Sequence, residues 1–188
     1  MKVDTQRWID RWVGQVLCRV VSLWVRLTRR GQPAAQLGSA PSHILVILLS
    51  EMGSIVLAGP MFAELRKRYP GVTLHVLQLK KNQEVSVLLG LARPEHLHAL
   101  DDSSGIGLLR DIWRVSMAMR RLPLDAVIDC ELFSRISSLM SFLVGAPLRV
   151  GFTPHTQEGL YRGRTSTAPS PTTPTSTSAS SFCHWLTH

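Results

Sequence analysis

The stretch His43-Ile-Leu-Val-Ile-Leu-Leu-Ser-Glu-Met-Gly-Ser-Ile-Val-Leu-Ala-Gly-Pro60 decides the fold of this chain. Its six consecutive apolar residues, 44–49, predict a strand buried on both faces, which is typical of a parallel sheet covered by helices. A short polar turn over residues 50–54 follows, and a helical pattern begins behind it. Because ligands of open α/β sheets bind outside the carboxyl ends of the strands, we expect this turn to border a binding site.

Strand and helix patterns alternate along the rest of the domain. The strand-like runs are 44–49, 72–79, 96–100, 125–132 and 149–152, and the helical patterns between them are 55–69, 82–91, 104–121 and 134–144. Alternation with short connections is typical of right-handed β-α-β units, which build a parallel sheet. The sequence therefore predicts an α/β fold, with a Rossmann-like parallel sheet and helices on both of its faces.

Composition and charge exclude several classes of protein. The chain has 188 residues, 45% of them hydrophobic, which is enough for one domain with a buried core. Its net charge of +8 arises mostly in residues 1–30, which hold seven basic and two acidic residues, so the charge distribution does not favour a nucleic-acid groove across the domain. The cysteines Cys18, Cys130 and Cys183 are too dispersed for a zinc site or a disulfide framework. We expect a reducing, cytoplasmic setting, with neither a metal nor a cofactor.

Residues 1–30 have the pattern of an amphipathic helix. Arginines recur on one arc, apolar residues on the opposite arc, and Trp8 and Trp12 lie at the border between them. This arrangement is typical of a helix on an anionic membrane surface, so we expect peripheral attachment to the inner face of the cytoplasmic membrane. The alternative is that the same apolar face packs on the domain or on a partner chain. Residues 31–42, rich in Pro, Gly and Ala, are interpreted as a linker.

The composition changes abruptly after Arg164. Residues 165–181 are all Thr, Ser, Pro or Ala, and residues 165–188 contain no Lys, Arg, Asp or Glu. Such a segment buries too little apolar surface to offset its ordering entropy, so we expect disorder over 165–188. It is either a natural tail or the product of a shifted reading frame. Codons for Tyr-Asn-Pro-Tyr-Ile-His-Ile-Ser-Gln-Gln-Phe-Leu-Ser-Leu-Ala-His, read one nucleotide late, can encode residues 172–187.

Two blocks of the sequence resemble glycosyltransferase family 9, which includes the heptosyltransferases of lipopolysaccharide core synthesis. The first block is residues 44–60 followed by Leu65-Arg-Lys-Arg-Tyr-Pro70. The second is Asp125-Ala-Val-Ile-Asp-Cys-Glu-Leu-Phe-Ser-Arg135 followed by Gly145-Ala-Pro-Leu-Arg-Val-Gly-Phe152. The blocks stand in the order expected for the family, and we take residues 43–164 as one Rossmann-like domain.

The resemblance implies an enzyme larger than this chain. Family 9 enzymes have two Rossmann-like domains in a GT-B arrangement, of which the first mainly binds the acceptor and the second the nucleotide-sugar donor, and they invert the anomeric centre. Residues 43–164 would be the first domain, so the chain would be truncated or frameshifted after about residue 164 and inactive by itself. The expected function is heptosyltransferase-like transfer of a sugar from a nucleotide-sugar donor to a lipid-linked saccharide acceptor of the lipopolysaccharide type.

The turn after the first strand holds the candidate catalytic residues. In the family, the carboxylate that deprotonates the acceptor hydroxyl directly follows the turn glycine, which is Gly53 here, and this chain has Ser54 at that position. Glu51 is the nearest substitute for this general base, and Ser50 and Gly53 are expected to contact the substrate. The alternatives are a solvated Glu51 at a helix N-terminus and a Ser54 that caps the helix.

A second candidate cluster follows the fourth strand and would lie on the same rim. Its members, expected to contact the acceptor, are Asp129, Glu131, Ser134 and Arg135. The alternatives are that Asp129 accepts a hydrogen bond from the neighbouring loop, and that Arg135 forms an ion pair with Glu131 at helical spacing. Arg162, in a polar stretch beyond the last strand, is expected to meet phosphate or acidic sugar groups unless it is simply an exposed loop residue.

Two other functions stay open. One is a nucleotide-binding Rossmann module of an oxidoreductase, although the first turn has the single glycine Gly53 where the dinucleotide fingerprint needs three. The other is a non-enzymatic membrane adaptor whose active part is the amphipathic helix. The dispersed histidines, among them His75, His96 and His98, are interpreted as strand or surface residues without a common role.

Overall fold

The computed structural model describes residues 41–131, 135–152 and 168–170 of the chain, and all structural statements refer to these residues. Their strands form one six-stranded sheet in the order β3-β2-β1-β4-β5-β6, in which all neighbours are parallel. The strands are β1 (His43–Leu48), β2 (Thr73–Leu79), β3 (Leu97–Leu100), β4 (Ala126–Asp129), β5 (Leu148–Phe152) and β6 (Ala168–Ser170). The helices are α2 (Met52–Arg68), α3 (Gln83–Leu88), α4 (Gly105–Met119) and α5 (Arg135–Val144), with short 3-10 turns at Lys80–Asn82 and Pro94–His96.

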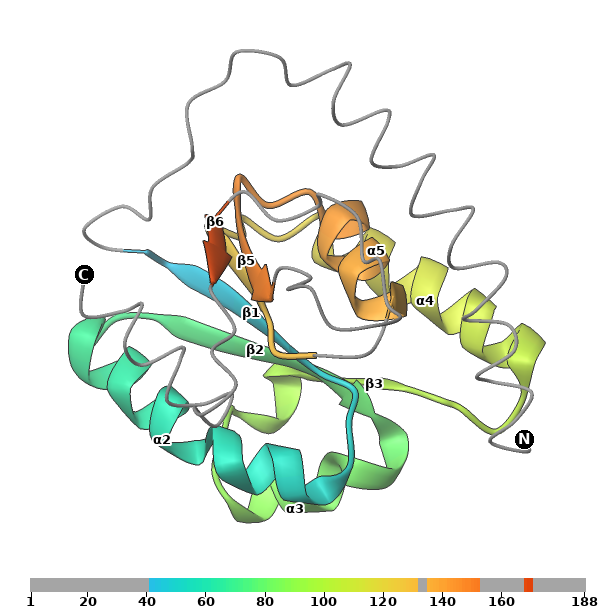
Figure 1. The fold of residues 1–188 in the computed structure, drawn as a ribbon, viewed down its shortest axis with the longest axis horizontal. Coiled ribbons are helices and arrows are strands. Elements are labelled where there is room, and N and C mark those ends of the chain that lie inside the picture. Colours follow the sequence, from blue (N-terminus) through green and yellow to red (C-terminus); the bar gives the residue numbers. More distant parts are fainter. Residues whose placement is uncertain (1–40, 132–134, 153–167, 171–188) are drawn as a thin grey trace.

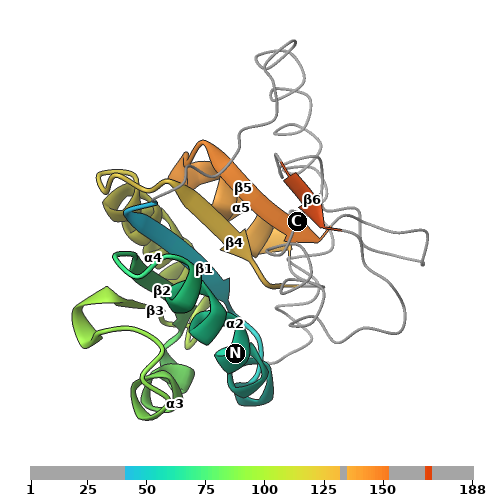
Figure 2. The same cartoon turned by 90° about the vertical axis from the view of Figure 1, so that its left-hand side faces the viewer.

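The sheet lies between two layers of helices, with α2 and α3 on one face and α4 and α5 on the other (Figure 1 and Figure 2). β1 runs through its middle, and residues 44–48 are at most 2% exposed. Alternate residues of β1 enter two separate cores, which is why the strand is a continuous apolar run rather than an alternating one. The predicted Rossmann-like parallel sheet with helices on both faces is confirmed.

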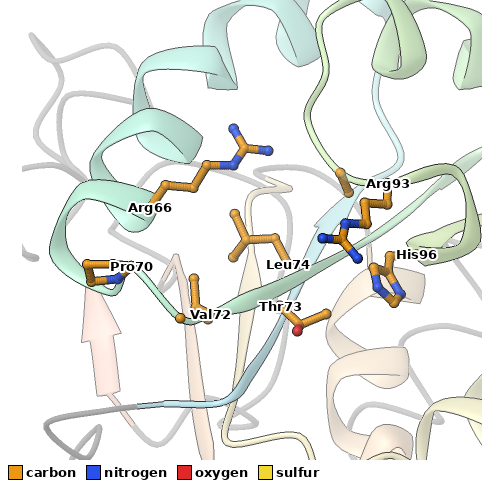
Figure 3. A pocket seen from close by; sticks show the side chains of 9 residues that line it. Arg66, Pro70, Val72, Thr73, Leu74, Arg93 and His96 are labelled. Carbon is orange, nitrogen blue, oxygen red and sulfur yellow. The ribbon is translucent and has the colours of Figure 1, made fainter.

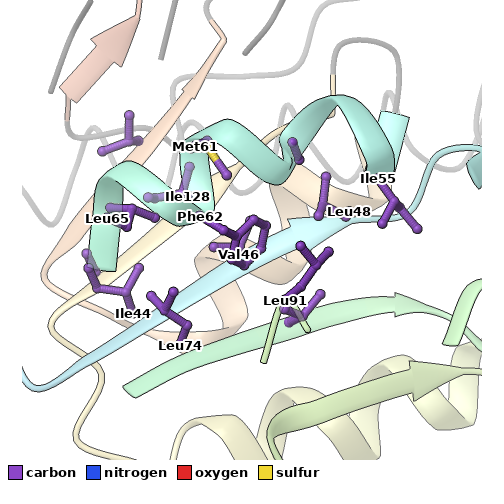
Figure 4. Close-up of a cluster of buried hydrophobic side chains, with 14 of the residues drawn as sticks. Ile44, Val46, Leu48, Ile55, Met61, Phe62, Leu65, Leu74, Leu91 and Ile128 are labelled. Atoms are coloured by element: carbon purple, nitrogen blue, oxygen red, sulfur yellow. The ribbon is translucent and has the colours of Figure 1, made fainter. Parts of the chain in front are cut away.

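The first core joins the sheet to α2 (Figure 4). Ile44 and Val46 of β1 belong to one buried cluster with Phe62 and Leu65 of α2 and Leu74 of β2. The buried residues of α2 recur at intervals of three and four, which is the spacing of one helix face. Each such side chain contributes about 1.5–3 kcal/mol when fully buried, so this core fixes α2 and the turn that precedes it.

The second core lies on the opposite face of the sheet. Leu45 and Ile47 of β1 pack there with Ile112 and Val115 of α4 and Met140 of α5. α4 therefore has one apolar side that is buried, and the sequence pattern over 104–121 predicts this helix within a few residues. β4 is shorter than the predicted strand 125–132, because the chain leaves the sheet after Asp129.

The starts of α2 and α4 differ in how they are capped. α2 starts at Met52 after the N-cap residue Glu51, and no side chain caps it. The backbone N of Ser54 already donates to the O of Glu51 at 3.0 Å, so Ser54 lies inside the helix and the prediction that it is the cap is wrong. In α4, by contrast, the hydroxyl of the N-cap Ser104 accepts a hydrogen bond of 3.1 Å from the backbone N of Gly107.

Replacing Ser104 by Ala is expected to lower the free energy of unfolding by about 1 kcal/mol, because the backbone N of Gly107 loses its acceptor. Ser54→Ala removes no cap, and its expected change stays within about 0.5 kcal/mol. Urea denaturation of both variants, followed by circular dichroism, measures the difference. Equal losses would show that the side chain of Ser54 caps α2 in solution.

β6 lies inside the segment 165–188 for which the sequence predicts disorder. Its residues pair in parallel with 150–152 of β5, so the prediction does not hold at 168–170. A sheet accepts a residue such as Pro169 on an edge strand, because only one side of that strand pairs. The predicted helix 1–30, most of the linker 31–42 and the rest of the tail lie outside the described residues. Within the described ranges, no helix is long and apolar enough to cross a membrane.

Candidate functional site

The order in which the chain adds strands to the sheet reverses between β1 and β4. From β1 the chain continues to β2 and β3 on one side, and from β4 to β5 and β6 on the other. The connections that leave the carboxyl ends of β1 and β4 therefore diverge, and open α/β sheets bind their ligands at such a switch point. Ser50 and Glu51 follow β1 at this carboxyl edge, and Glu131 follows β4.

Glu131 ties the two strand ends together. Its Oε1 accepts hydrogen bonds from the backbone N of Leu49 at 2.6 Å and of Ser50 at 2.7 Å, and its Oε2 accepts one from the hydroxyl of Ser50. The side chain is only 5% exposed, and a buried carboxylate is costly unless it is hydrogen-bonded. These donors meet that requirement, so Glu131 holds the turn after β1 in place.

Asp129 holds the start of α5 to the end of β4. Its Oδ1 accepts a hydrogen bond of 3.1 Å from the backbone N of Glu131, and its Oδ2 accepts one of 3.0 Å from the hydroxyl of Ser137. The predicted alternative, a hydrogen bond to the neighbouring loop, is what the structure shows. Burial, with the charges of Asp129 and Glu131, raises the pKa of the Cys130 thiol well above its usual range. The thiol therefore stays protonated and is a poor nucleophile.

Glu51 has the accessible carboxylate of the turn. Its side chain is 87% exposed, makes no capping hydrogen bond to α2, and has an ion-pair partner in Lys81, 3.5 Å away and itself half exposed. Exposed ion pairs of this kind contribute little to stability, so the carboxylate is able to meet a ligand. Ser54 and Gly53 are also exposed, and a Cβ at Gly53 would meet no atom within 4 Å, which leaves open space beside the start of α2.

The structure thus brings together part of the predicted site. Ser50, Asp129 and Glu131 form one hydrogen-bonded group at the carboxyl edge, and Glu51 follows it directly. Arg135 begins α5, but its side chain lies outside the described part of the molecule, so the predicted pair with Glu131 stays a prediction. The remaining two predicted contacts, Ser134 and Arg162, also lie outside the described residues.

Polar residues at the end of β2 and after it complete the carboxyl edge, and the sequence reasoning missed them. The amide Nδ2 of Asn82 donates to the backbone O of Ser50 at 2.7 Å, and the hydroxyl of Ser86 donates to the Oε1 of Gln78. Gln78, Asn82 and Ser86 are fully buried. The signal that could have found Asn82 is its position, because it follows β2 as Ser50 follows β1.

A cluster of histidines lies toward the amino edge of the same sheet. The Nδ1 of His43 is 3.1 Å from the Nε2 of His75, whose Nδ1 is 3.3 Å from the Nε2 of His98. His96 packs edge-on against His75, with 4.7 Å between the ring centroids. His75 and His98 are strand residues, as interpreted, but they are not dispersed, because β1, β2 and β3 bring them and His43 side by side. Burial and the neighbouring histidines lower the pKa of His75 to about 4.

A cavity of about 280 Å³ opens near this cluster, at the start of β2 (Figure 3). Arg66, Arg93 and His96 are the ionisable side chains of its lining. The guanidinium of Arg66 already donates hydrogen bonds within the domain, to the backbone O atoms of Gly90 at 2.8 Å and Leu91 at 2.5 Å. This cavity is at the opposite edge from the carboxylates, so we place the candidate site at the carboxyl edge. Among the described residues, no group of His, Cys, Asp and Glu has the arrangement of a metal site.

Comparisons with known proteins identify the fold. No family model and no curated protein matches the sequence. The solved structure of the glycosyltransferase family 9 protein from Veillonella parvula DSM 2008 has a TM-score of 0.64 and 18% identity, and the match covers 82% of this chain and 42% of that chain. Two structures of E. coli heptosyltransferase WaaC, with ADP-2-deoxy-2-fluoro heptose and with ADP, have TM-scores of 0.61 at 12% and 13% identity. They match 74% and 76% of this chain and 45% of their own.

The likeness is one of fold, since the identities are low, and the chain spans less than half the length of these solved structures. It agrees with the family indicated by the two sequence blocks. The described residues therefore have the Rossmann-like fold found in glycosyltransferase family 9 structures.

Proposed function

We propose that this chain is the acceptor-side part of a heptosyltransferase-like glycosyltransferase, which transfers a sugar from a nucleotide-sugar donor to a lipid-linked saccharide of the lipopolysaccharide type. The observation that supports this most is the match to family 9 structures, two of which contain ADP or an ADP-sugar. The polar group at the switch point lies where such a fold binds ligands. The complete activity belongs to a two-domain enzyme, because this chain spans less than half of those structures.

Glu51 fits the role of general base better than Asp129 and Glu131, the two carboxylates nearest to it at the switch point between β1 and β4. Asp129 and Glu131 are at least 95% buried and accept hydrogen bonds from the backbone and from serines. Glu51 is exposed and is not used in capping. A base must come within about 2.6–3.2 Å of the acceptor hydroxyl, and an exposed side chain at the start of a helix has the freedom to do so. Ser54 has no carboxylate and cannot replace it.

Ser50 and Glu131 have positioning roles in this proposal. The hydroxyl of Ser50 donates to Glu131, so its oxygen keeps lone pairs that can accept a hydrogen bond from a sugar hydroxyl. The open space at Gly53 would admit the sugar beside the start of α2. Glu131 acts through Ser50, because its buried carboxylate fixes the turn that carries both Ser50 and Glu51.

The proposed function is tested in two steps. The nucleotide sequence from codon 160 onward should contain an alternative frame that encodes a second Rossmann-like domain. The protein encoded by the restored frame should transfer radiolabelled sugar from an ADP-sugar to a lipopolysaccharide-core acceptor, whereas the 188-residue chain should show no transfer. Transfer by the purified 188-residue chain would contradict the half-enzyme assignment. The absence of a second domain in every frame would favour the membrane adaptor.

Deletion of residues 1–30 is expected to weaken binding to anionic vesicles. The segment holds seven basic residues, and each one near such a surface contributes on the order of 1 kcal/mol. Co-sedimentation of the full chain with vesicles should be stronger than that of the shortened chain, and it should fall at high salt. Equal sedimentation of the two chains would contradict peripheral attachment through this segment.

A further inference from the structure

α4 turns a strip of apolar side chains away from the domain. Ile106, Leu109 and Trp113 are 85%, 62% and 62% exposed, while Ile112 and Val115 on the other side of the helix are buried in the second core. At about 100° per residue, the three exposed side chains fall within an arc of about 60°. We name Ile106, Leu109 and Trp113 the α4 strip. Figure 1 shows α4 on the outer side of its layer, next to α5.

Arginines border the α4 strip. Arg110 and Arg114 are exposed and begin about 40° beyond Ile106 around the helix. Arg120 and Arg121 are exposed where the helix ends. Arg110 and Arg114 thus lie beside the strip, and Arg120 and Arg121 lie beyond Trp113 at the end of the helix. A partner for the strip must therefore also accommodate arginines.

The acidic residues near α4 are mostly neutralised. Asp111 is 9% exposed and pairs with Arg114, with 2.8 Å between the Oδ1 and Nη2 atoms. Asp101, before the helix, pairs with Lys80 at 3.5 Å, and its neighbour Asp102 is partly buried. The outward side of α4 is therefore positive as well as apolar.

We propose that the α4 strip is a docking surface for an anionic lipid bilayer. Single exposed apolar residues are common on proteins, but a tryptophan and two aliphatic side chains bordered by arginines have the composition of a helix that binds at a membrane interface. A bilayer supplies hydrocarbon for the strip and anionic headgroups for Arg110, Arg120 and Arg121. A protein partner would need a matched apolar pocket and separate carboxylates to satisfy the same surface.

The position of α4 in the fold gives this docking a direction. α4 begins just after the carboxyl end of β3, so its first turn, with Ile106, lies at the same edge of the sheet as Ser50 and Glu51. A bilayer on the strip would hold this edge near the headgroups, where the saccharide of a lipid-linked acceptor is located. This use of the docking rests on the proposed function, whereas contact with lipid is measured independently of sugar transfer.

Trp113 is a built-in probe, because the other four tryptophans lie outside the domain at positions 8, 12, 24 and 185. In the full chain with those four changed to Phe, the emission of Trp113 should shift to the blue on addition of phosphatidylglycerol–phosphatidylcholine vesicles. Brominated acyl chains should quench this emission, since the ring would lie at the headgroup boundary. Vesicles of phosphatidylcholine alone should give little shift, because they lack the anionic charge.

Two substitutions and one matched control test the strip itself. Ile106→Ser should weaken the lipid-induced change at Trp113 by about fivefold, and Arg110→Gln by a similar factor. Leu88→Ser on α3 removes a side chain of the same exposure, 86%, from the opposite face of the sheet and should have no effect. Circular dichroism of each variant checks that the fold is kept.

Several outcomes would overturn this inference. If the chain sediments with anionic vesicles while the emission of Trp113 stays unchanged and unquenched, only residues 1–30 contact the lipid. If the emission shifts with protein concentration in the absence of lipid, the strip binds a second copy of the chain. Failure of the two-domain enzyme to transfer sugar would contradict the proposed function but not the binding of the α4 strip to lipid, which is measured separately.

Discussion

A two-domain enzyme that contains this chain and carries Glu51→Gln is expected to transfer sugar at least about 100-fold more slowly than the unchanged enzyme. Glutamine keeps the size and much of the hydrogen bonding of glutamate, but it cannot accept the proton of the acceptor hydroxyl. Because Glu51 is 87% exposed and caps nothing, the substitution leaves the fold intact. Steady-state kinetics should show the loss in kcat, with little change in the KM for the acceptor.

Ser54→Ala is the matched control for this result. Ser54 lies on the first turn of the same helix and is exposed, but it has no group that could act as a base, so its replacement should change kcat by less than about threefold. A fully active Glu51→Gln enzyme would show that the base lies elsewhere, with Asp129 and Glu131 at the switch point as the next candidates. Substitutions of these two would lower stability as well as activity, because both are buried and hydrogen-bonded.

The stability of the domain is expected to fall by about 1–3 kcal/mol between pH 7 and pH 4, largely through His75, while burial and His96 lower the pKa of the neighbouring His98 as well. Burial and the neighbouring His96, His98 and His43 lower the pKa of His75 from 6.5 to about 4. The unfolded chain therefore binds a proton at His75 as the pH falls below 6.5, whereas the folded domain does so only near pH 4. Stability is thus lost across this window and levels off below it. Urea unfolding of the full chain at several pH values measures the slope.

His75→Gln should remove most of this pH dependence, since glutamine fills the buried position without a titrating group. His96→Gln serves as the histidine control, because His96 lies at the border of the cluster and is less buried than His75. Its pH dependence should be weaker than that of the unchanged chain but not lost, because burial, and after it the charge of His96, lowers the pKa of His75. An unchanged slope in His75→Gln would assign the acid sensitivity to other groups.

The positions of the strands could be predicted from the sequence because burial leaves a local signal. The apolar run 44–49 indicates a central strand by itself, and Ser50, Glu51 and Glu131 could be placed at one edge because parallel strands share their carboxyl end. The partners of these residues could not be predicted in the same way. That Glu131 accepts from the backbone of Leu49 and Ser50 depends on the register of β1 against β4, across 81 and 82 residues.

The contacts within the histidine cluster could not be predicted from the sequence either. His43, His75 and His98 belong to three strands, and nothing within any one strand indicates that the three side chains meet. Their contact follows from the strand order and from the register, in which His75 pairs with Leu45 and His98 with Leu77. The prediction that Ser54 caps α2 failed for a different reason. Serine is a preferred N-cap residue, but the helix begins three residues earlier, with Glu51 as its N-cap.

The central place of β1 in the sheet also determines how early the middle of the domain can form. β1 and β2 are synthesised early and can pair at once, but the other edge of β1 waits for β4, which ends at residue 129. At about 5–20 residues per second, synthesis from Ser50 to Glu131 takes roughly 4–16 s. During that interval one side of a strand made almost wholly of Ile, Leu and Val has no neighbour on the nascent chain. The contact of Ser50 with Glu131 at the carboxyl edge therefore forms only after residue 131 is made. A ribosome-bound chain shorter than 131 residues should be a substrate for chaperones that bind exposed apolar strands.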